Sequence, residues 1–163
     1  MTNAWLYVHL AGVFGFLVAH GTSGAIGLRL RKERDPLRAR ALLDLSASAL
    51  GLANWSLLVL LVGGIGAAVK EHAFHQGWPW AAIGVLVALS LMVPLLVVPY
   101  YKEVRRVVGA VRPRRGRPAP EPTAPAPPEE IARVLDSPIP VYMAWIGVAA
   151  LAVLLWLMVY KPF

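Results

Sequence analysis

Four long apolar stretches constrain the fold of this 163-residue chain more than any other feature. The hydrocarbon core of a bilayer is about 30 Å thick, and a helix needs roughly 20 apolar residues to cross it. The stretches that meet this length are residues 4–28, 48–69, 78–100 and 140–160. Because backbone polar groups must be paired inside lipid, each stretch is expected to be a helix. The sequence therefore predicts an all-α, polytopic membrane protein, with a single domain built as an antiparallel bundle of four transmembrane helices.

The composition agrees with a membrane setting. Hydrophobic residues make up 58% of the chain, and the mean hydropathy is +0.59, more than a soluble domain can bury. The first stretch is too long for the apolar part of a signal peptide, and no basic segment precedes it. We therefore expect it to remain as a membrane span.

The distribution of Lys and Arg predicts the orientation of the chain. The sequence holds 16 such residues, and the groups that follow the first and third stretches are Arg29, Arg31, Lys32, Arg34, Arg38 and Arg40, then Lys102, Arg105, Arg106, Arg112, Arg114, Arg115, Arg117 and Arg133. Only Lys70 and Lys161 lie elsewhere. The positive-inside rule then predicts a multi-pass protein of the inner (cytoplasmic) membrane with both termini outside. Topology and anionic lipid account for the net charge of +7, so nucleic acid is not expected as a partner.

The segments between the apolar stretches carry local signals. Residues 112–128 are basic and then Pro/Ala-rich, which predicts an extended cytoplasmic linker. In residues 129–136, acidic residues precede apolar residues at helical spacing, which predicts a short interfacial helix on the inner face of the membrane. Asp35 followed by Pro36 is typical of a helix start, so the second helix is expected to begin before it reaches lipid.

Two histidines, His9 and His20, stand out within the first span. At helical spacing they are about 20° apart around the axis and about 16.5 Å apart along it. An adjoining row of small residues consists of Ala11, Gly15, Ala19, Ser23 and Gly27, and the opposite side carries Leu10, Phe14, Leu17 and Leu28. Small residues favour close helix contacts, so both imidazoles are expected to point into the bundle.

The predicted orientation places His9 near the outer surface, on the same side as His72 and His75. These three histidines form a candidate metal site. Imidazoles from different helices can also hold the iron of b-type haem, with His75 or Met158 as the second ligand to His9. His20 lies deeper and would need Met143 or Met92. The alternative is a packing role, in which a buried histidine bonds to a backbone carbonyl or to a polar side chain such as Asn54, Ser46, Ser48 or Ser90.

The usual catalytic templates are missing from the sequence. It contains no HExxH, GxSxG or Walker motif and no pair of carboxylates within a span. The absence of cysteine excludes disulfides, thiolate metal sites and cysteine nucleophiles. The sequence therefore leaves open whether the protein is an enzyme.

Several segments carry a family resemblance. YVHLAGVFGFLVAHGTSG, RKERDPLRARALLDLS, GLANWSLLVLLVGGIGA and IGVAALAVLLWLMVYKPF resemble a bacterial family of uncharacterised four-span integral membrane proteins. The first-helix histidine and the terminal run ending in Lys161, Pro162 and Phe163 are more distantly similar to the copper-resistance-D and membrane protoporphyrinogen-oxidase group. That similarity implies a four-helix core and, in the oxidase branch, a b-type haem held by a histidine at the position of His9.

Two functional hypotheses follow. In the first, the protein binds b-type haem through His9 and has a redox or haem-related role. In the second, it is a non-catalytic accessory or packing subunit of a larger membrane complex. The expected partners are the lipid bilayer and either other membrane subunits or a second copy in a homodimer.

Overall fold

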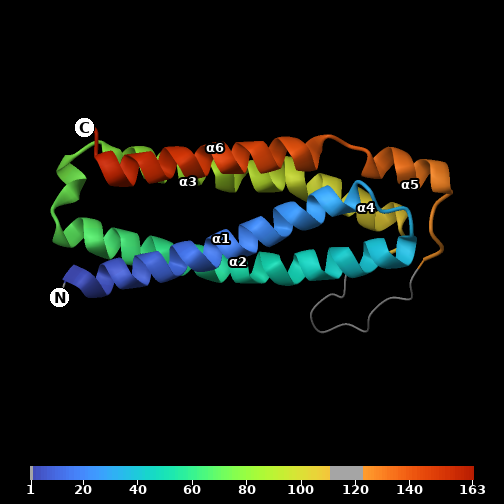
Figure 1. Ribbon diagram of the computed structural model, residues 1–163, viewed down its shortest axis with the longest axis horizontal. Helices are drawn as coiled ribbons and strands as arrows, with labels where there is room; N and C mark the ends of the chain where they lie inside the picture. Colours follow the sequence, from blue (N-terminus) through green and yellow to red (C-terminus); the bar gives the residue numbers. More distant parts are fainter. Residues whose placement is uncertain (1, 111–122) are drawn as a thin grey trace.

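The structure, a computed structural model, describes residues 2–110 and 123–163 and is built from helices (Figure 1). In chain order these are α1 (Thr2–Leu30), α2 (Pro36–Lys70), the 3₁₀ turn η1 (Ala73–His75), α3 (Trp78–Met92), the π-helical turn η2 (Val93–Val97), α4 (Val98–Val107), α5 (Pro128–Leu135) and α6 (Ile139–Tyr160). Among the described residues, four helical runs are long and apolar enough to cross a membrane. The predicted all-α, four-span architecture is confirmed.

The long helices lie side by side and alternate in direction (Figure 1). α1 packs along α2, and α6 packs along α3. The two pairs meet where Gly27 of α1 contacts Pro140 of α6. Both termini therefore lie at the same end of the bundle (Figure 1).

The second helix begins at the residue that the sequence predicts. The Leu37 backbone N–H donates to Asp35 Oδ1 at 2.9 Å, and Pro36 occupies the first turn. This cap satisfies a backbone donor that has no partner within the helix. α2 thus runs for 35 residues and begins 12 residues before the apolar stretch that starts at residue 48.

The third span is continuous but irregular. α3 passes into the π-helical turn Val93–Val97, and α4 then continues to Val107, beyond the predicted end of the apolar stretch. Pro94 and Pro99 lack the N–H that an α-helical ladder requires. A wider turn is a usual way for a helix to absorb such an interruption.

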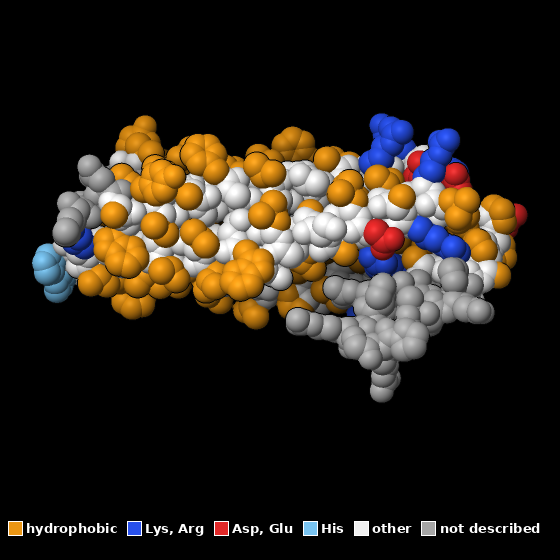
Figure 2. All heavy atoms as spheres, turned by 90° about the horizontal axis from the view of Figure 1, so that it is seen from below, with side chains coloured by type: hydrophobic (Ala, Val, Ile, Leu, Met, Phe, Trp, Pro, Cys, Tyr) orange, Lys and Arg blue, Asp and Glu red, His pale blue; other side chains and the backbone are white. Residues whose placement is uncertain are grey.

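The best-packed part of the protein is one end of the bundle, which we call the basic end. It comprises the last turns of α1, the first turns of α2, and α4 and α5. Its core residues are Ile26, Leu30, Ala39, Leu43, Tyr100, Val104, Val107, Val108, Ile131 and Leu135. Lys and Arg side chains gather mainly at this end, and apolar side chains cover the rest of the visible face (Figure 2).

The structure shows how the predicted short helix packs at the basic end. The sequence predicts a helix at 129–136 lying on the membrane face, and α5 is indeed a helix at Pro128–Leu135. Its apolar residues Ile131 and Leu135 are 3% and 0% exposed, however, because they belong to the protein core. The predicted linker 112–128 falls largely outside the described residues; at its end, the Ala126 N–H donates to the carbonyl of Val107 at 2.8 Å.

The opposite end of the bundle is closed by the last residues of the chain. The backbone N–H groups of Gly77 and Trp78 donate to Phe163 O at 3.0 and 3.1 Å. Lys161 Nζ lies 3.6 Å from Glu71 Oε2 and 5.6 Å from the Trp78 ring centroid. These contacts join the end of α6 to the start of α3.

Candidate functional site

His9 lies in the closest contact between two helices of the structure. Gly12 of α1 faces the backbone of Leu60, and Gly63 of α2 faces the backbone of His9. A Cβ atom at either glycine would overlap the neighbouring main chain. The two glycines therefore allow α1 and α2 to approach backbone to backbone, as small residues do in membrane helix pairs.

This approach brings the His9 imidazole to a backbone carbonyl of α2. His9 Nδ1 lies 2.9 Å from the Leu60 carbonyl oxygen, and Gly64 leaves room for the ring beside it. A carbonyl oxygen only accepts, so Nδ1 carries a proton and donates it. His9 is half-buried. Its side chain is thus fixed in both position and tautomer by α2.

His20 contacts a different helix, and its side chain is exposed, whereas the sequence predicts that both imidazoles point into the bundle. Its Nε2 lies against Gly147 of α6, at a position that a Cβ atom would occupy. The ring stacks on Phe16 with centroids 5.8 Å apart and an interplanar angle of 11°. His9 therefore contacts α2 and His20 contacts α6, although the sequence places both on one side of α1.

The other predicted ligands are two loop histidines and a methionine of α6. His72, which has a left-handed backbone (φ 53°), and His75 are exposed in the connection between α2 and α3. Met158 is half-buried on α6. Among the described residues, no three His, Cys, Asp or Glu side chains are arranged to hold a metal ion. The structure does not bring His9, His72 and His75 together, and haem binding stays a prediction.

Only some residues of the predicted small-residue row on α1 contact neighbouring helices. Ala19 is buried, Gly15 faces Ser56 Oγ, and Gly27 packs against Pro140 and Tyr101, whereas Ala11 is exposed. On the predicted lipid side, Leu10, Phe14 and Leu28 are exposed. The sequence interpretation did not include Gly12 of α1 or Gly63 of α2 among the contact residues. The glycine pair at 63–64 was the available signal for a close contact on α2.

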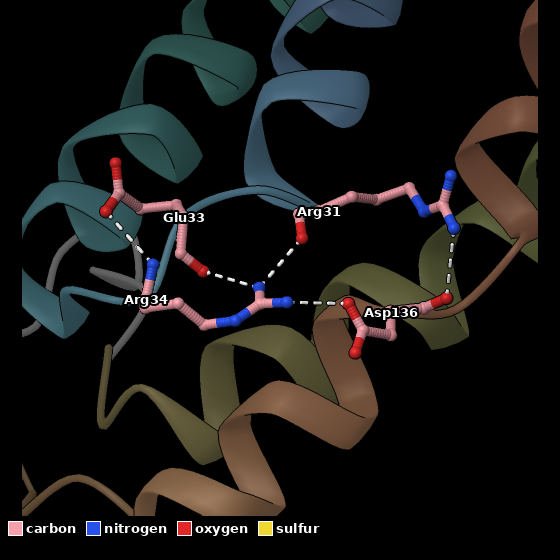
Figure 3. A network of polar contacts seen from close by, with 4 residues as sticks. All are labelled: Arg31, Glu33, Arg34 and Asp136. Carbon is pink, nitrogen blue, oxygen red and sulfur yellow. Dashed lines mark hydrogen bonds and ion pairs between the residues drawn. The ribbon is translucent and has the colours of Figure 1, made fainter.

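A polar network fixes the basic end (Figure 3). Arg34 Nη2 donates to Asp136 Oδ1 at 2.7 Å, and Arg34 Nη1 donates to the carbonyls of Arg31 and Glu33. Arg31 Nη2 donates to the carbonyl of Asp136 at 3.3 Å. The connection between α1 and α2 is thereby tied to the connection between α5 and α6.

Other arginines of the basic end bond to backbone carbonyls. Arg40 Nε donates to Val108 O at 2.7 Å, and Arg105 Nη2 donates to Leu43 O at 2.9 Å. Arg106 Nη2 lies 2.6 Å from Glu103 Oε1 and 2.7 Å from Glu130 Oε1. Val108 follows the end of α4, where charged donors satisfy carbonyls that have no partner within the helix. These arginines are therefore part of the tertiary structure as well as markers of orientation.

Glu33 has the clearest electrostatic environment outside the spans. Its Oε1 accepts the backbone N–H groups of Asp35 at 3.1 Å and Arg34 at 3.0 Å. These bonds favour the carboxylate and lower the pKa of Glu33. The charged form of Glu33 therefore supports the turn that leads into α2.

Comparisons of the chain with protein-family models, with curated proteins and with solved structures gave no match. The functional argument therefore rests on side-chain geometry. The side chains that this geometry brings forward are the His9 imidazole, bonded to α2, and a set of guanidinium groups at the basic end.

Proposed function

We propose that this is a non-catalytic integral membrane protein of the bacterial cytoplasmic membrane that serves as an accessory subunit of a larger membrane complex. One observation carries the proposal: both histidines in the first span are engaged in contacts between helices. His9 donates to the Leu60 carbonyl, and His20 fills the space beside Gly147. The His9 contact joins α1 to α2, and the contact of the exposed His20 side chain joins α1 to α6.

The basic end is the part that faces the cytoplasm in this proposal. Its cations follow the first and third spans, as the positive-inside rule requires. It is also where the buried core lies, so it offers a surface of defined shape. Exposed Arg133 of α5 belongs to that surface.

The spectrum of the purified protein tests the packing role of the histidines. Protein from cells grown with ample haem is expected to show no Soret band before or after dithionite. His9→Ala is then expected to lower the midpoint of thermal unfolding, since the buried contact at Leu60 is lost. A Soret band that disappears in the His9→Ala protein would contradict the packing role.

Photo-crosslinking in intact membranes tests the subunit role. A photo-activatable amino acid at Arg133 is expected to give a cross-link to one other membrane protein. The same group at exposed Trp80, in the first turn of α3, serves as the control and should not give that product. Absence of the product at Arg133 would count against an accessory subunit that docks through this surface.

A haem-related role is the second candidate, and the tautomer of His9 favours it. Ligating histidines commonly donate their other N–H to a backbone carbonyl, which is the bond that His9 Nδ1 makes with Leu60. In this candidate His9 would hold the iron through Nε2, with Met158 as the second ligand that the sequence predicts. A bound b-type haem would supply one-electron redox chemistry. A Soret band that is lost in His9→Ala and retained in His20→Ala would support this role.

A further inference from the structure

Asn54 is an unpaired polar side chain within the second span. It is exposed on α2, and it makes no hydrogen bond with another described residue. It lies about 9 Å beyond residue 48, where the apolar stretch begins, and therefore within the hydrocarbon. An amide without partners in such a setting carries a large desolvation cost.

Three hydroxyl side chains in or next to the spans are satisfied by their own helix. Ser90 Oγ donates to Leu86 O at 2.8 Å, and Thr22 Oγ1 donates to Val18 O at 2.7 Å. Ser48 Oγ donates to Asp44 O at 3.3 Å. Asn54 differs from them because nothing in its own helix pairs with the amide.

The surface around Asn54 has the spacing of a helix-packing stripe. Its exposed members are Ala47, Gly51, Asn54 and Leu58, and steps of four and three residues are the pattern of two helices that pack lengthwise. A Cβ atom added at Gly51 would meet nothing within 4 Å. The stripe lies away from the α1 contact, which uses Ser56, Leu60 and Gly63.

We infer that this stripe of α2 binds the same stripe of a second copy of the chain, with the two Asn54 amides hydrogen-bonded to each other. Copies inserted with the same topology hold Asn54 at the same depth. An amide carries both a donor and an acceptor, so it is complementary to itself across a two-fold axis. This pairing satisfies Asn54 without a polar group from any other protein. The inference is independent of the proposed function.

Disulfide formation tests the interface, because the chain contains no cysteine. Gly51→Cys and Leu58→Cys place a thiol on the stripe. Leu52→Cys is the matched control, since Leu52 is exposed on the same helix and lies about 160° around the axis from Asn54. Oxidation of native membranes is expected to give a dimer from the first two variants and not from the third. Equal dimer yields from all three, or a product that contains a different protein, would overturn the inference.

Substitution of Asn54 tests the amide pair itself. Asn54→Leu is expected to weaken dimer formation in mild detergent by about three- to thirtyfold, the range found for hydrogen bonds between membrane helices. Asn54→Gln keeps the donor and acceptor and should retain most of the dimer. Energy transfer between labelled copies measures the dimer fraction, and circular dichroism checks that each variant stays helical. A monomeric unmutated protein, or an unchanged dimer in Asn54→Leu, would overturn the inference.

Discussion

At the scale of single residues, glycines determine which helix each histidine side chain contacts. His9 reaches the Leu60 carbonyl because Gly12 and Gly63 let two backbones meet, and His20 reaches α6 because Gly147 leaves space. A side chain of any size at Gly12 or Gly63 would move a helix, and one at Gly147 would displace the His20 ring. The role of each imidazole thus depends on a residue in a neighbouring helix.

Gly12→Ala is therefore expected to destabilise the protein by about 1–3 kcal/mol, the usual cost of overpacking, since the new methyl group overlaps the backbone of Leu60. Gly21→Ala in the same helix is the control. A Cβ atom there meets nothing within 4 Å, and the change is expected to stabilise the helix by about 0.5–1 kcal/mol. Thermal unfolding in detergent measures both. Equal losses for the two variants would contradict the assigned contact.

Glu33 makes the stability of the basic end depend on pH. Bonds from the Asp35 and Arg34 N–H groups lower the pKa of its carboxyl in the folded protein. The stabilisation is then complete above the pKa of the unfolded chain, about 4.3, and is lost as the pH falls through the lower folded value. The midpoint of unfolding is expected to fall less in Glu33→Gln than in the unmutated protein between pH 6 and pH 3. Identical pH profiles would show that Glu33 has no such role.

At the scale of elements, α5 shows most clearly how the tertiary contacts of a helix can differ from those that its sequence pattern predicts. The order of acidic and apolar residues correctly predicts a short helix. Its apolar side is covered by protein at the basic end, where helices extend beyond the apolar stretches. The hydrophobic effect drives packing at the basic end. Between the spans it does not, because lipid is as apolar as the helix surfaces.

Leu135→Ala is expected to cost about 2–5 kcal/mol, as for other buried leucines, because Leu135 is fully buried in this core. Arg133→Ala, at an exposed site on the same helix, should change stability little. Hydrogen exchange of residues 128–135 is the readout. Faster exchange is expected in Leu135→Ala alone, and equal protection in both variants would mean that α5 is held by other contacts.

At the scale of the whole molecule, the two ends of the bundle differ in chemistry. The basic end carries the arginine network and the core, while the opposite end is closed by Phe163 against Gly77 and Trp78. Because the long helices alternate in direction, both termini lie at that opposite end (Figure 1). The proposed topology assigns the basic end to the cytoplasm.

Cysteine labelling in whole cells tests this topology. Gln76→Cys and Lys32→Cys place thiols at exposed positions of the two ends. An impermeant maleimide that reaches the periplasm is expected to label Gln76→Cys in intact cells, and Lys32→Cys only after the membrane is opened. The reverse pattern would invert the proposed orientation.

Local chemistry was enough to predict much of the fold from the sequence by itself. Apolar length determined the four spans, and the Asp35 cap with Pro36 determined where α2 begins. Both signals depend on a few neighbouring residues and on the thickness of the bilayer.

The partner of each helix face was decided only by the tertiary structure. Periodicity places His9 and His20 on one side of α1 but does not reveal that α2 binds one and α6 the other. The pair Arg34 and Asp136 joins residues 102 positions apart, and the burial of Leu135 depends on four elements that meet at one end. The physical reason is that lipid is as apolar as the helices, so close packing at glycines, rather than hydrophobicity, selects which faces meet.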